Sequence, residues 1–199
     1  MATETELRQK ALSQVKTFLA ECDIKDYQGR KIFEIGFGNG LFVDQCRKEG
    51  LVPTGLEISR EYVEEVRTKF PNLDLLWYDG GTFPAADASY DFVVSFQVLE
   101  HVNSTEHIID ESIRILKPGG IMYHVSPNYG SFYEGHYNLI WLPFLNKTLG
   151  RYYLKMLRRY TPYYESLNLI KPVAVERVLR RRSGDITVLS LGRREFINN

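Results

Sequence analysis

The segment most suggestive of chemistry is a loop with alternating glycines, Glu34-Ile35-Gly36-Phe37-Gly38-Asn39-Gly40. It follows a short apolar run and precedes a helical pattern. Glycine is favoured where a turn is tight and where a ligand must approach backbone amides closely. The nucleotide-binding pattern G-x-G-x-x-G requires a final glycine at a position that Leu41 occupies. The segment therefore predicts a ligand-binding loop that differs from the dinucleotide fingerprint.

Alternating strand and helix patterns must position this loop. We expect an opening amphipathic helix from the spacing of apolar residues at 7, 11, 15 and 18. Apolar runs predict strands over 31–35, 51–58, 73–78, 90–96 and 121–125, with helices over 41–48, 60–70 and about 103–116. The pattern predicts an α/β fold, a doubly wound and mostly parallel sheet with right-handed crossovers. Ligands bind such sheets at the carboxyl ends of the strands.

Local signals set the expected boundaries of two helices. Ser59 is the expected N-cap of the helix over 60–70. Asn103 followed by Glu106 predicts the start of the fourth helix, with Ile109, Ile113 and Leu116 as its buried stripe. The residues Lys117-Pro118-Gly119-Gly120 are expected to stop that helix before the fifth strand.

Over residues 30–128 the chain resembles the class I S-adenosylmethionine-dependent methyltransferases, and most closely the small-molecule branch of ubiquinone and menaquinone biosynthesis enzymes. The resemblance rests on the E/D-x-G-x-G-x-G loop, on Glu57 and Asp79-Gly80, and on the segments 91–102 and 114–120. It implies a Rossmann-like methyltransferase fold with S-adenosylmethionine as cofactor.

The resemblance also implies roles for individual residues. Gly36, Phe37 and Gly38 would line the methionine part, with Glu34 anchoring the loop, and Glu57 would hold both ribose hydroxyls. A carboxylate can accept two hydrogen bonds from a vicinal diol, and Glu57 lies 21 positions after Gly36. The remaining expected contacts are Ile58 packing on the adenine, Asp79 accepting from its amino group, and further cofactor contacts at Gly40, Gly80 and Gln97.

Two other classes of function stay open at this stage. A nicotinamide-dependent oxidoreductase would share the fold and the acidic residue, but the glycine pattern disfavours it. A catalytically silent binding module with the methyltransferase fold is harder to distinguish from an enzyme. Such a module is expected to have lost the glycine loop or Glu57, and this sequence keeps both.

Methyl transfer to a hydroxyl needs a general base, whereas transfer to an ionised carboxylate does not. His101 follows the fourth strand and is the first candidate base, and His136 is the second. His107 is expected at the surface and His124 in the core. Some quinone-pathway relatives carry a Glu-x-x-Glu-His metal site in this region, but Gln97 replaces the first carboxylate here. Magnesium prefers several hard oxygen ligands, so we expect no metal.

Residues 129–171 are expected to form a mostly helical lid over the acceptor, rich in aromatic and basic side chains. The aromatic-rich stretch 129–144 can line a pocket or form the lid's own core, and a basic helix is expected over 147–159. A weak resemblance of 135–143 to saccharide and lipid-linked glycan methyltransferases suggests a small-molecule, glycan or lipid-linked acceptor. A helix from 172 to about 182 and a strand over 186–191 are expected to follow.

Charge is unevenly distributed although the net charge is zero. Residues 1–146 carry 13 Lys and Arg against 21 Asp and Glu, whereas residues 147–182 carry 10 against 2. The basic segment suits an anionic acceptor or a peripheral contact with a membrane surface, and no nucleic acid is expected. The acidic start, the two cysteines and the absence of a long apolar run predict a cytoplasmic protein.

The expected organisation is one methyltransferase domain over 1–199. It comprises an N-terminal helix (1–28), a cofactor-binding core (29–128), a substrate lid (129–171) and a C-terminal helix and strand (172–199). Sheets of this family have seven strands, and little sequence remains after 191 to build the last. The edge of the sheet is therefore expected to be incomplete or to be completed by a partner chain.

Overall fold

The structure is a computed structural model that describes residues 3–143, 145–182, 184 and 186–188. The chain divides into two compact units. The first, the sheet unit, comprises residues 1–98 and 107–125, and the second, the hairpin unit, comprises residues 99–106 and 126–199.

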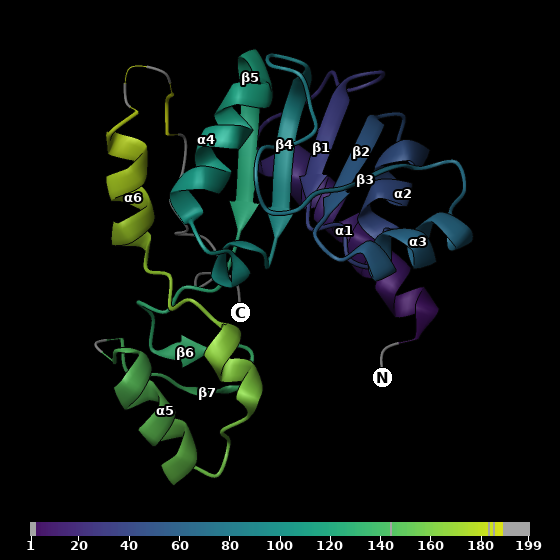
Figure 1. Cartoon of the computed structure of the whole chain (residues 1–199). Helices are drawn as coiled ribbons and strands as arrows, with labels where there is room; N and C mark the ends of the chain where they lie inside the picture. Colours follow the sequence, from purple (N-terminus) through teal and green to yellow (C-terminus); the bar gives the residue numbers. More distant parts are fainter. Residues whose placement is uncertain (1–2, 144, 183, 185, 189–199) are drawn as a thin grey trace. The chain divides into compact units, whose positions relative to one another are not determined.

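The sheet unit contains five parallel strands in the order β3-β2-β1-β4-β5 (Figure 1). The strands are β1 Lys31–Ile35, β2 Val52–Glu57, β3 Asp74–Trp77, β4 Tyr90–Phe96 and β5 Leu116–Val125. The helices are α1 Glu4–Glu21, α2 Leu41–Lys48, α3 Arg60–Lys69 and α4 Thr105–Ile115, whose first two residues belong to the hairpin unit. This arrangement confirms the predicted doubly wound parallel sheet.

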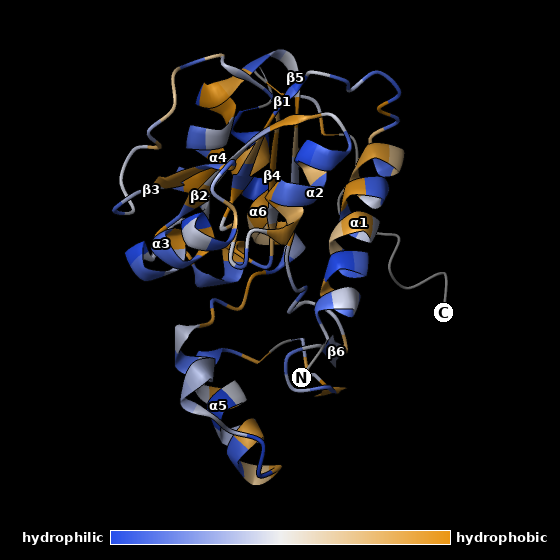
Figure 2. Ribbon diagram, turned by 90° about the vertical axis from the view of Figure 1, so that its right-hand side faces the viewer, coloured by the Kyte–Doolittle hydropathy of each residue, from blue (hydrophilic) through white to orange (hydrophobic). Residues whose placement is uncertain are grey.

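Helix α1 forms where the sequence pattern places it. Thr3 and Glu6 make a reciprocal capping box at its N-terminus, satisfying free amide donors. Its buried face includes Val15 and Phe18, and the Phe18 ring meets Phe92 of β4 edge-on at 5.5 Å. In Figure 2 the strands are coloured mostly as hydrophobic and α3 mostly as hydrophilic, which is the pattern of a sheet whose faces are covered.

The boundary between α4 and β5 differs from the prediction. The helix begins at Thr105, and its buried apolar residues are Ile108, Ile109 and Ile115 rather than a stripe through Ile113 and Leu116. Strand β5 begins directly at Leu116. The residues Lys117-Pro118-Gly119-Gly120 are accommodated within this strand by an irregularity in the pairing, because Tyr90 pairs with Leu116 and Phe92 with Ile121.

The hairpin unit contains less helix than the sequence suggested. An antiparallel pair, β6 Tyr133–Glu134 and β7 Leu139–Ile140, precedes helix α5 Lys147–Met156. Short 3₁₀ turns lie at Leu99–His101 (η1) and Pro162–Ser166 (η2), and helix α6 spans Pro172–Arg180. The prediction of a mostly helical segment over 129–171 was therefore wrong for residues 133–140.

Aromatic side chains form the core of the hairpin unit. Trp141, Tyr129 and Tyr164 are almost fully buried, and Leu154 of α5 packs with them. A Cβ atom at Gly150 would lie 2.8 Å from the Trp141 ring, so glycine allows α5 to approach this core closely. Part of the aromatic-rich stretch is thus structural, whereas Phe132 and Tyr133 are exposed.

The strand predicted over 186–191 is not found where the structure describes this segment. Residues 186–188 have no strand structure, and 189–191 lie outside the described residues. None of the helices in the described ranges is both long and apolar enough to cross a membrane.

Candidate functional site

The glycine loop lies at the carboxyl end of β1, as predicted. Gly36 has φ +73°, and its amide donates to the Leu56 carbonyl at 2.7 Å. A Cβ atom there would lie 2.5 Å from Cγ2 of Val98, so only glycine fits. Gly38, at φ +51°, has nothing within 4 Å of where a Cβ would be. The loop thus presents its backbone to open space at Gly38.

Glu57 holds the loop to the end of β2. Its Oε2 accepts from the Gly38 amide at 3.3 Å, and its Oε1 accepts from the amides of Ile58 and Ser59 at 2.9 and 3.2 Å. The carboxylate is only partly buried, which leaves acceptor capacity for a ligand hydroxyl. The predicted ribose-binding residue is therefore fixed beside the predicted loop.

Ile58 and Gly80 lie together beyond the ends of β2 and β3. Ile58 is 58% exposed although it is a large apolar residue. Its Cδ1 lies 3.8 Å from where a Gly80 Cβ would be, so the two residues border one surface. Asp79 is exposed, and its Oδ1 accepts from the Gly81 amide at 3.0 Å. An exposed apolar side chain beside a carboxylate matches the expected contacts with an adenine ring.

Phe37 and Gly40 have roles that the sequence did not reveal. The Phe37 side chain is 3% exposed and packs in the core with Val63 and Val66, so only its backbone can reach a ligand. A Cβ atom at Gly40 would lie 2.4 Å from Cγ1 of Val66. Gly40 therefore allows α3 to pack closely against the start of α2.

Glu34 was expected to anchor the loop, but its side chain makes no hydrogen bond to the loop among the described residues. It is 5% exposed on β1, and its Oε2 has no hydrogen-bond partner in the described part of the chain. Burial and the nearby Glu57 carboxylate raise the pKa of Glu34 well above its usual value. The loop is tied through Glu57 instead, and Glu34 offers a buried oxygen that a donor could satisfy.

Gln97 directly follows β4 and has a strained backbone conformation. Its φ is +57°, although it is not a glycine, and its amide donates to the Val125 carbonyl at 2.7 Å. The residue is exposed at the carboxyl edge of the sheet. Such strain tends to be kept at functional sites.

These features fit S-adenosylmethionine. The loop offers exposed backbone at Gly38, and Glu57 offers a carboxylate for a ribose diol. Ile58 offers an apolar surface for adenine. Glu34 adds a buried oxygen, without a hydrogen-bond partner in the described part of the chain, on the strand that leads into the loop. The expected cofactor contacts thus gather at one end of the sheet unit.

The hairpin unit contains both predicted bases. His136 Nδ1 lies 2.8 Å from Oε1 of Glu134, and the Glu134 carboxylate is almost fully buried. The Tyr129 hydroxyl lies 3.3 Å from the same Nδ1. His101 is exposed, and its Nε2 lies 3.2 Å from the Tyr163 hydroxyl. Burial and the nearby His136 lower the pKa of His101.

Glu100 lies between these histidines. It is fully buried, neither carboxylate oxygen has a hydrogen-bond partner in the described ranges, and burial raises its pKa. Its Oε1 is 4.0 Å from Nε2 of His136. Ligand atoms of Glu100, His101 and His136 lie within 4.8 Å of one another, a set that could hold a zinc-class ion. The expectation of no metal stays a prediction.

Sequence reasoning missed Glu134 and Tyr163. Glu134 stands two residues before His136 on the hairpin, a spacing that could have signalled the pair. Tyr163 lies 62 residues from His101, and no local pattern links them. Of the other histidines, His107 bonds the Gly81 carbonyl at 2.8 Å and steadies the loop after β3. His124 lies in β5, where Nδ1 of its ring lies 2.7 Å from Ser95 Oγ, and its buried Nε2 has no hydrogen-bond partner among the described residues.

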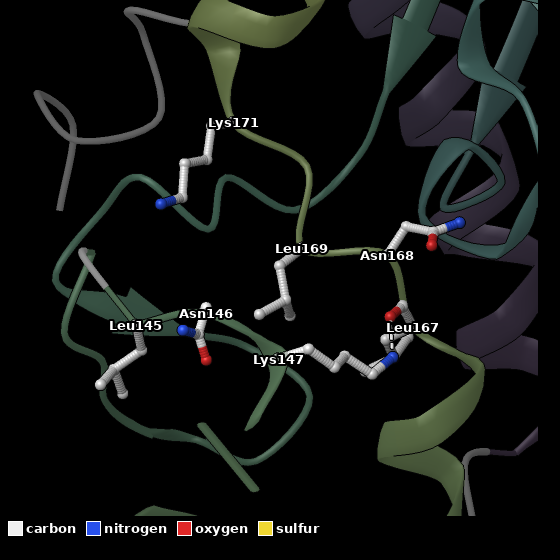
Figure 3. A pocket seen from close by; sticks show the side chains of 7 residues that line it. All are labelled: Leu145, Asn146, Lys147, Leu167, Asn168, Leu169 and Lys171. Carbon is white, nitrogen blue, oxygen red and sulfur yellow. Dashed lines mark hydrogen bonds between the residues drawn. The ribbon is translucent and has the colours of Figure 1, made fainter. Parts of the chain in front are cut away.

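Two cavities lie within the hairpin unit. The first, of about 510 Å³, is lined by Leu145, Asn146, Lys147, Leu167, Asn168, Leu169 and Lys171 (Figure 3). There the Lys147 ammonium is engaged by the carbonyls of Glu165 and Leu167. The second, of about 410 Å³, is lined by His136, Tyr137, Arg158, Arg159, Tyr160, Thr161 and Tyr163. It therefore contains one of the predicted bases.

Comparison with known proteins places the sheet unit in a family. Residues 33–124 match the family described as methyltransferase domain. A protein of Mycolicibacterium smegmatis named "Probable S-adenosylmethionine-dependent methyltransferase" is 34% identical over 107 residues, which cover 54% of this chain and 42% of that protein. The ubiquinone biosynthesis O-methyltransferase of Vibrio vulnificus is 30% identical over 107 residues, covering 50% of this chain and 45% of that protein. The matched stretch thus spans less than half the length of these relatives.

Solved structures agree on the fold. A chain of the Haloferax volcanii complex between the Trm112 methyltransferase activator and a methyltransferase superposes with a TM-score of 0.60 at 19% identity, covering 89% of this chain and 70% of that one. An S-adenosylmethionine-dependent methyltransferase of Mesorhizobium loti superposes with a TM-score of 0.52 at 19% identity, covering 62% and 61%. Residues 33–124, which include the glycine loop and Glu57, therefore match the methyltransferase domain family, and the chain is similar to S-adenosylmethionine-dependent methyltransferases.

Proposed function

We propose that this chain transfers the methyl group of S-adenosylmethionine to an oxygen of a small molecule, saccharide or lipid-linked metabolite. The observation that carries the proposal is the bond from the Gly38 amide to Glu57, which joins the glycine loop to the predicted ribose-binding carboxylate. A module that had lost cofactor binding would not need to keep both parts together.

Bound S-adenosylmethionine supplies a methyl group already activated on a sulfonium. The protein then has to orient the acceptor, exclude water and take a proton. Backbone at Gly38 and the carboxylate of Glu57 would orient the cofactor, and the exposed Ile58 would cover its adenine.

His136 is the better supported of the two candidate bases. When Nδ1 donates to Glu134, Nε2 is left as an acceptor that can take the proton of an acceptor hydroxyl. Nε2 of His101 is instead engaged by the Tyr163 hydroxyl. We therefore assign His136 as the base and His101 as the alternative.

Chain connectivity supports this division of roles. The hairpin unit begins at Leu99 and again at Ser126, directly after β4 and β5. The segments that carry the candidate bases thus follow the carboxyl ends of β4, an internal strand, and β5, an edge strand. In doubly wound sheets this is the end where ligands bind.

Calorimetric titration of the purified chain with S-adenosylhomocysteine tests the proposal, with NAD as the control ligand. We expect micromolar affinity for S-adenosylhomocysteine and no binding of NAD. Binding of NAD instead would favour the oxidoreductase alternative. Binding of S-adenosylhomocysteine without methyl transfer to any acceptor in a broad screen would favour the silent module.

A further inference from the structure

The second cavity of the hairpin unit has the size of a small-molecule site. Its volume is about 410 Å³, and its lining residues come from the hairpin, the end of α5 and the turn η2. Ligand pockets commonly range from about 300 to 1,000 Å³. His136, the proposed base, is one of the lining residues.

The hydroxyl groups of this cavity already have partners. Tyr137 and Thr161 bond each other at 2.9 Å, whereas Tyr160 donates to a Glu165 oxygen at 3.0 Å. Tyr163 pairs with His101 at 3.2 Å. The polar groups left for a ligand are therefore Nε2 of His136 and two guanidinium groups.

Those guanidinium groups, of Arg158 and Arg159, are exposed and have no carboxylate within 4.0 Å among the described residues. Two other arginines of the hairpin unit do have such partners. Arg151 pairs with Glu165 at 2.7 Å, and Arg180 pairs with Glu176 at 2.6 Å. The lining contains no acidic side chain, so the cavity presents unpaired positive charge.

The backbone at Arg158 makes this arginine unusual. The Arg158 amide donates to Lys155 O at 3.0 Å and the Arg159 amide to Leu154 O at 2.9 Å, closing the C-terminus of α5. This pattern is a Schellman motif, whose left-handed residue is usually glycine. Arg158 occupies that position with φ +54°. A strained arginine where glycine is favoured suggests that its side chain has a use.

We propose that this cavity binds the acceptor through an anionic group, a carboxylate or a phosphate, gripped by Arg158 and Arg159. Guanidinium groups bind both anions through paired, charge-assisted hydrogen bonds. His136 lines the same cavity and would meet the reacting part of that molecule. The assignment of this ligand as the acceptor rests on the proposed function.

The test is direct binding of small anions to the full chain by calorimetry. Benzoate and phenyl phosphate are compared with benzamide, which has the same ring without the charge. We expect at least one anion to bind about tenfold or more tighter than benzamide. The anion that binds more tightly shows whether the group held by the two arginines is a carboxylate or a phosphate. Equal affinities for all three ligands would overturn the proposal.

Arg158→Gly separates recognition from folding, because glycine suits the left-handed conformation. We expect it to weaken anion binding about tenfold while the thermal midpoint stays constant or rises. Arg177→Ala is the matched control, since Arg177 is an exposed arginine outside the cavity, and should bind as the parent does. Undiminished anion binding in Arg158→Gly would refute the assignment.

Cofactor binding distinguishes the two proposals. If anions bind through Arg158 but S-adenosylhomocysteine does not bind, the cavity stands and the methyltransferase proposal fails. If S-adenosylhomocysteine binds and the anions do not, the cavity assignment alone fails.

Discussion

Oε1 of Glu134 lies 2.8 Å from Nδ1 of His136. The Glu134 carboxylate is buried, whereas the side chain of His136 is 19% exposed. Oε2 of Glu134 is occupied by the Tyr137 amide at 2.7 Å, which fixes the carboxylate within the hairpin. A carboxylate held in this way sets the tautomer of its histidine. In the proposed function, this pairing would leave Nε2 of His136 free to accept a proton.

We predict that His136→Asn lowers kcat by about 100-fold or more, as expected for loss of a general base. Glu134→Gln should lower kcat by about tenfold with little change in KM, because it removes the charge that orients the ring. The measurement is steady-state methyl transfer to an acceptor found by screening. Glu176→Gln, in an exposed pair on α6, is the control. A larger loss in His101→Asn than in His136→Asn would reverse the assignment of the base.

We predict that Glu57→Ala weakens S-adenosylhomocysteine binding strongly. An unmet ribose diol costs on the order of 1–3 kcal/mol, which is about 5- to 150-fold in affinity. Release of the Gly38 amide adds to this loss, since Glu57 also holds the loop. Calorimetry measures the effect, and Glu61→Ala on the exposed side of α3 serves as the control. An affinity equal to that of the parent would show that Glu57 does not bind the cofactor.

We predict that Gly36→Ala destabilises the fold by about 1–3 kcal/mol and abolishes cofactor binding, because the new Cβ would clash with Val98 in a left-handed conformation. Gly119→Ala provides the matched control. Gly119 has φ +76° but nothing within 4 Å of a Cβ, so it carries the strain without the clash. Urea unfolding compares the two variants. Equal losses would mean that the contact with Val98 is irrelevant.

The glycine loop and the succession of strands and helices along the chain could be predicted because both depend on local sequence patterns. The loop pattern lies between a strand and a helix, and Ser59 accepts from the Tyr62 amide at 3.3 Å as an N-cap should. The start of β5 was misplaced because Pro118-Gly119-Gly120 is typical of a turn. Pairing with β4 overrode that local preference and absorbed these residues as an irregularity.

The site in the hairpin unit could be predicted only in part. His101 and His136 were found by residue type, but their partners depend on tertiary packing. Strands β6 and β7 have two residues each, too short for an alternating pattern to show. The sequence predicts Arg158 only as part of a basic helix. Its left-handed backbone conformation after the end of α5 could not be predicted, because no sequence pattern indicates an arginine at that position.

We predict that chelators leave methyl transfer intact. The cluster of Glu100, His101 and His136 offers a single carboxylate, whereas magnesium prefers several oxygen ligands. Activity is measured after treatment with EDTA and after addition of magnesium or zinc. Loss of activity that magnesium restores would overturn this interpretation of Gln97 and Glu100. Restoration by zinc alone would instead assign the cluster as a zinc-class site.

We predict that the stability of the fold decreases below pH 6.5 because of His124. Burial of its ring lowers the pKa of His124 to about 4, against about 6.5 in an unfolded chain. Above pH 6.5 the ring is neutral in both states and contributes no pH dependence. As the pH falls below 6.5, the unfolded state gains a proton that the folded state does not. The free energy of unfolding then decreases by about 1.4 kcal/mol per pH unit until about pH 4.

His124→Asn removes this titration while Asn can still bond Ser95 Oγ, the present partner of the ring. We expect the variant to be less stable than the parent at pH 7.5, because the ring no longer fills its site. The difference should shrink by about 2 kcal/mol between pH 7.5 and pH 5. Urea unfolding at each pH measures both proteins side by side. Comparing them cancels the opposing contributions of Glu34 and Glu100, whose raised pKa values stabilise the fold as the pH falls. A difference that stays constant with pH would show that His124 titrates normally in the folded protein.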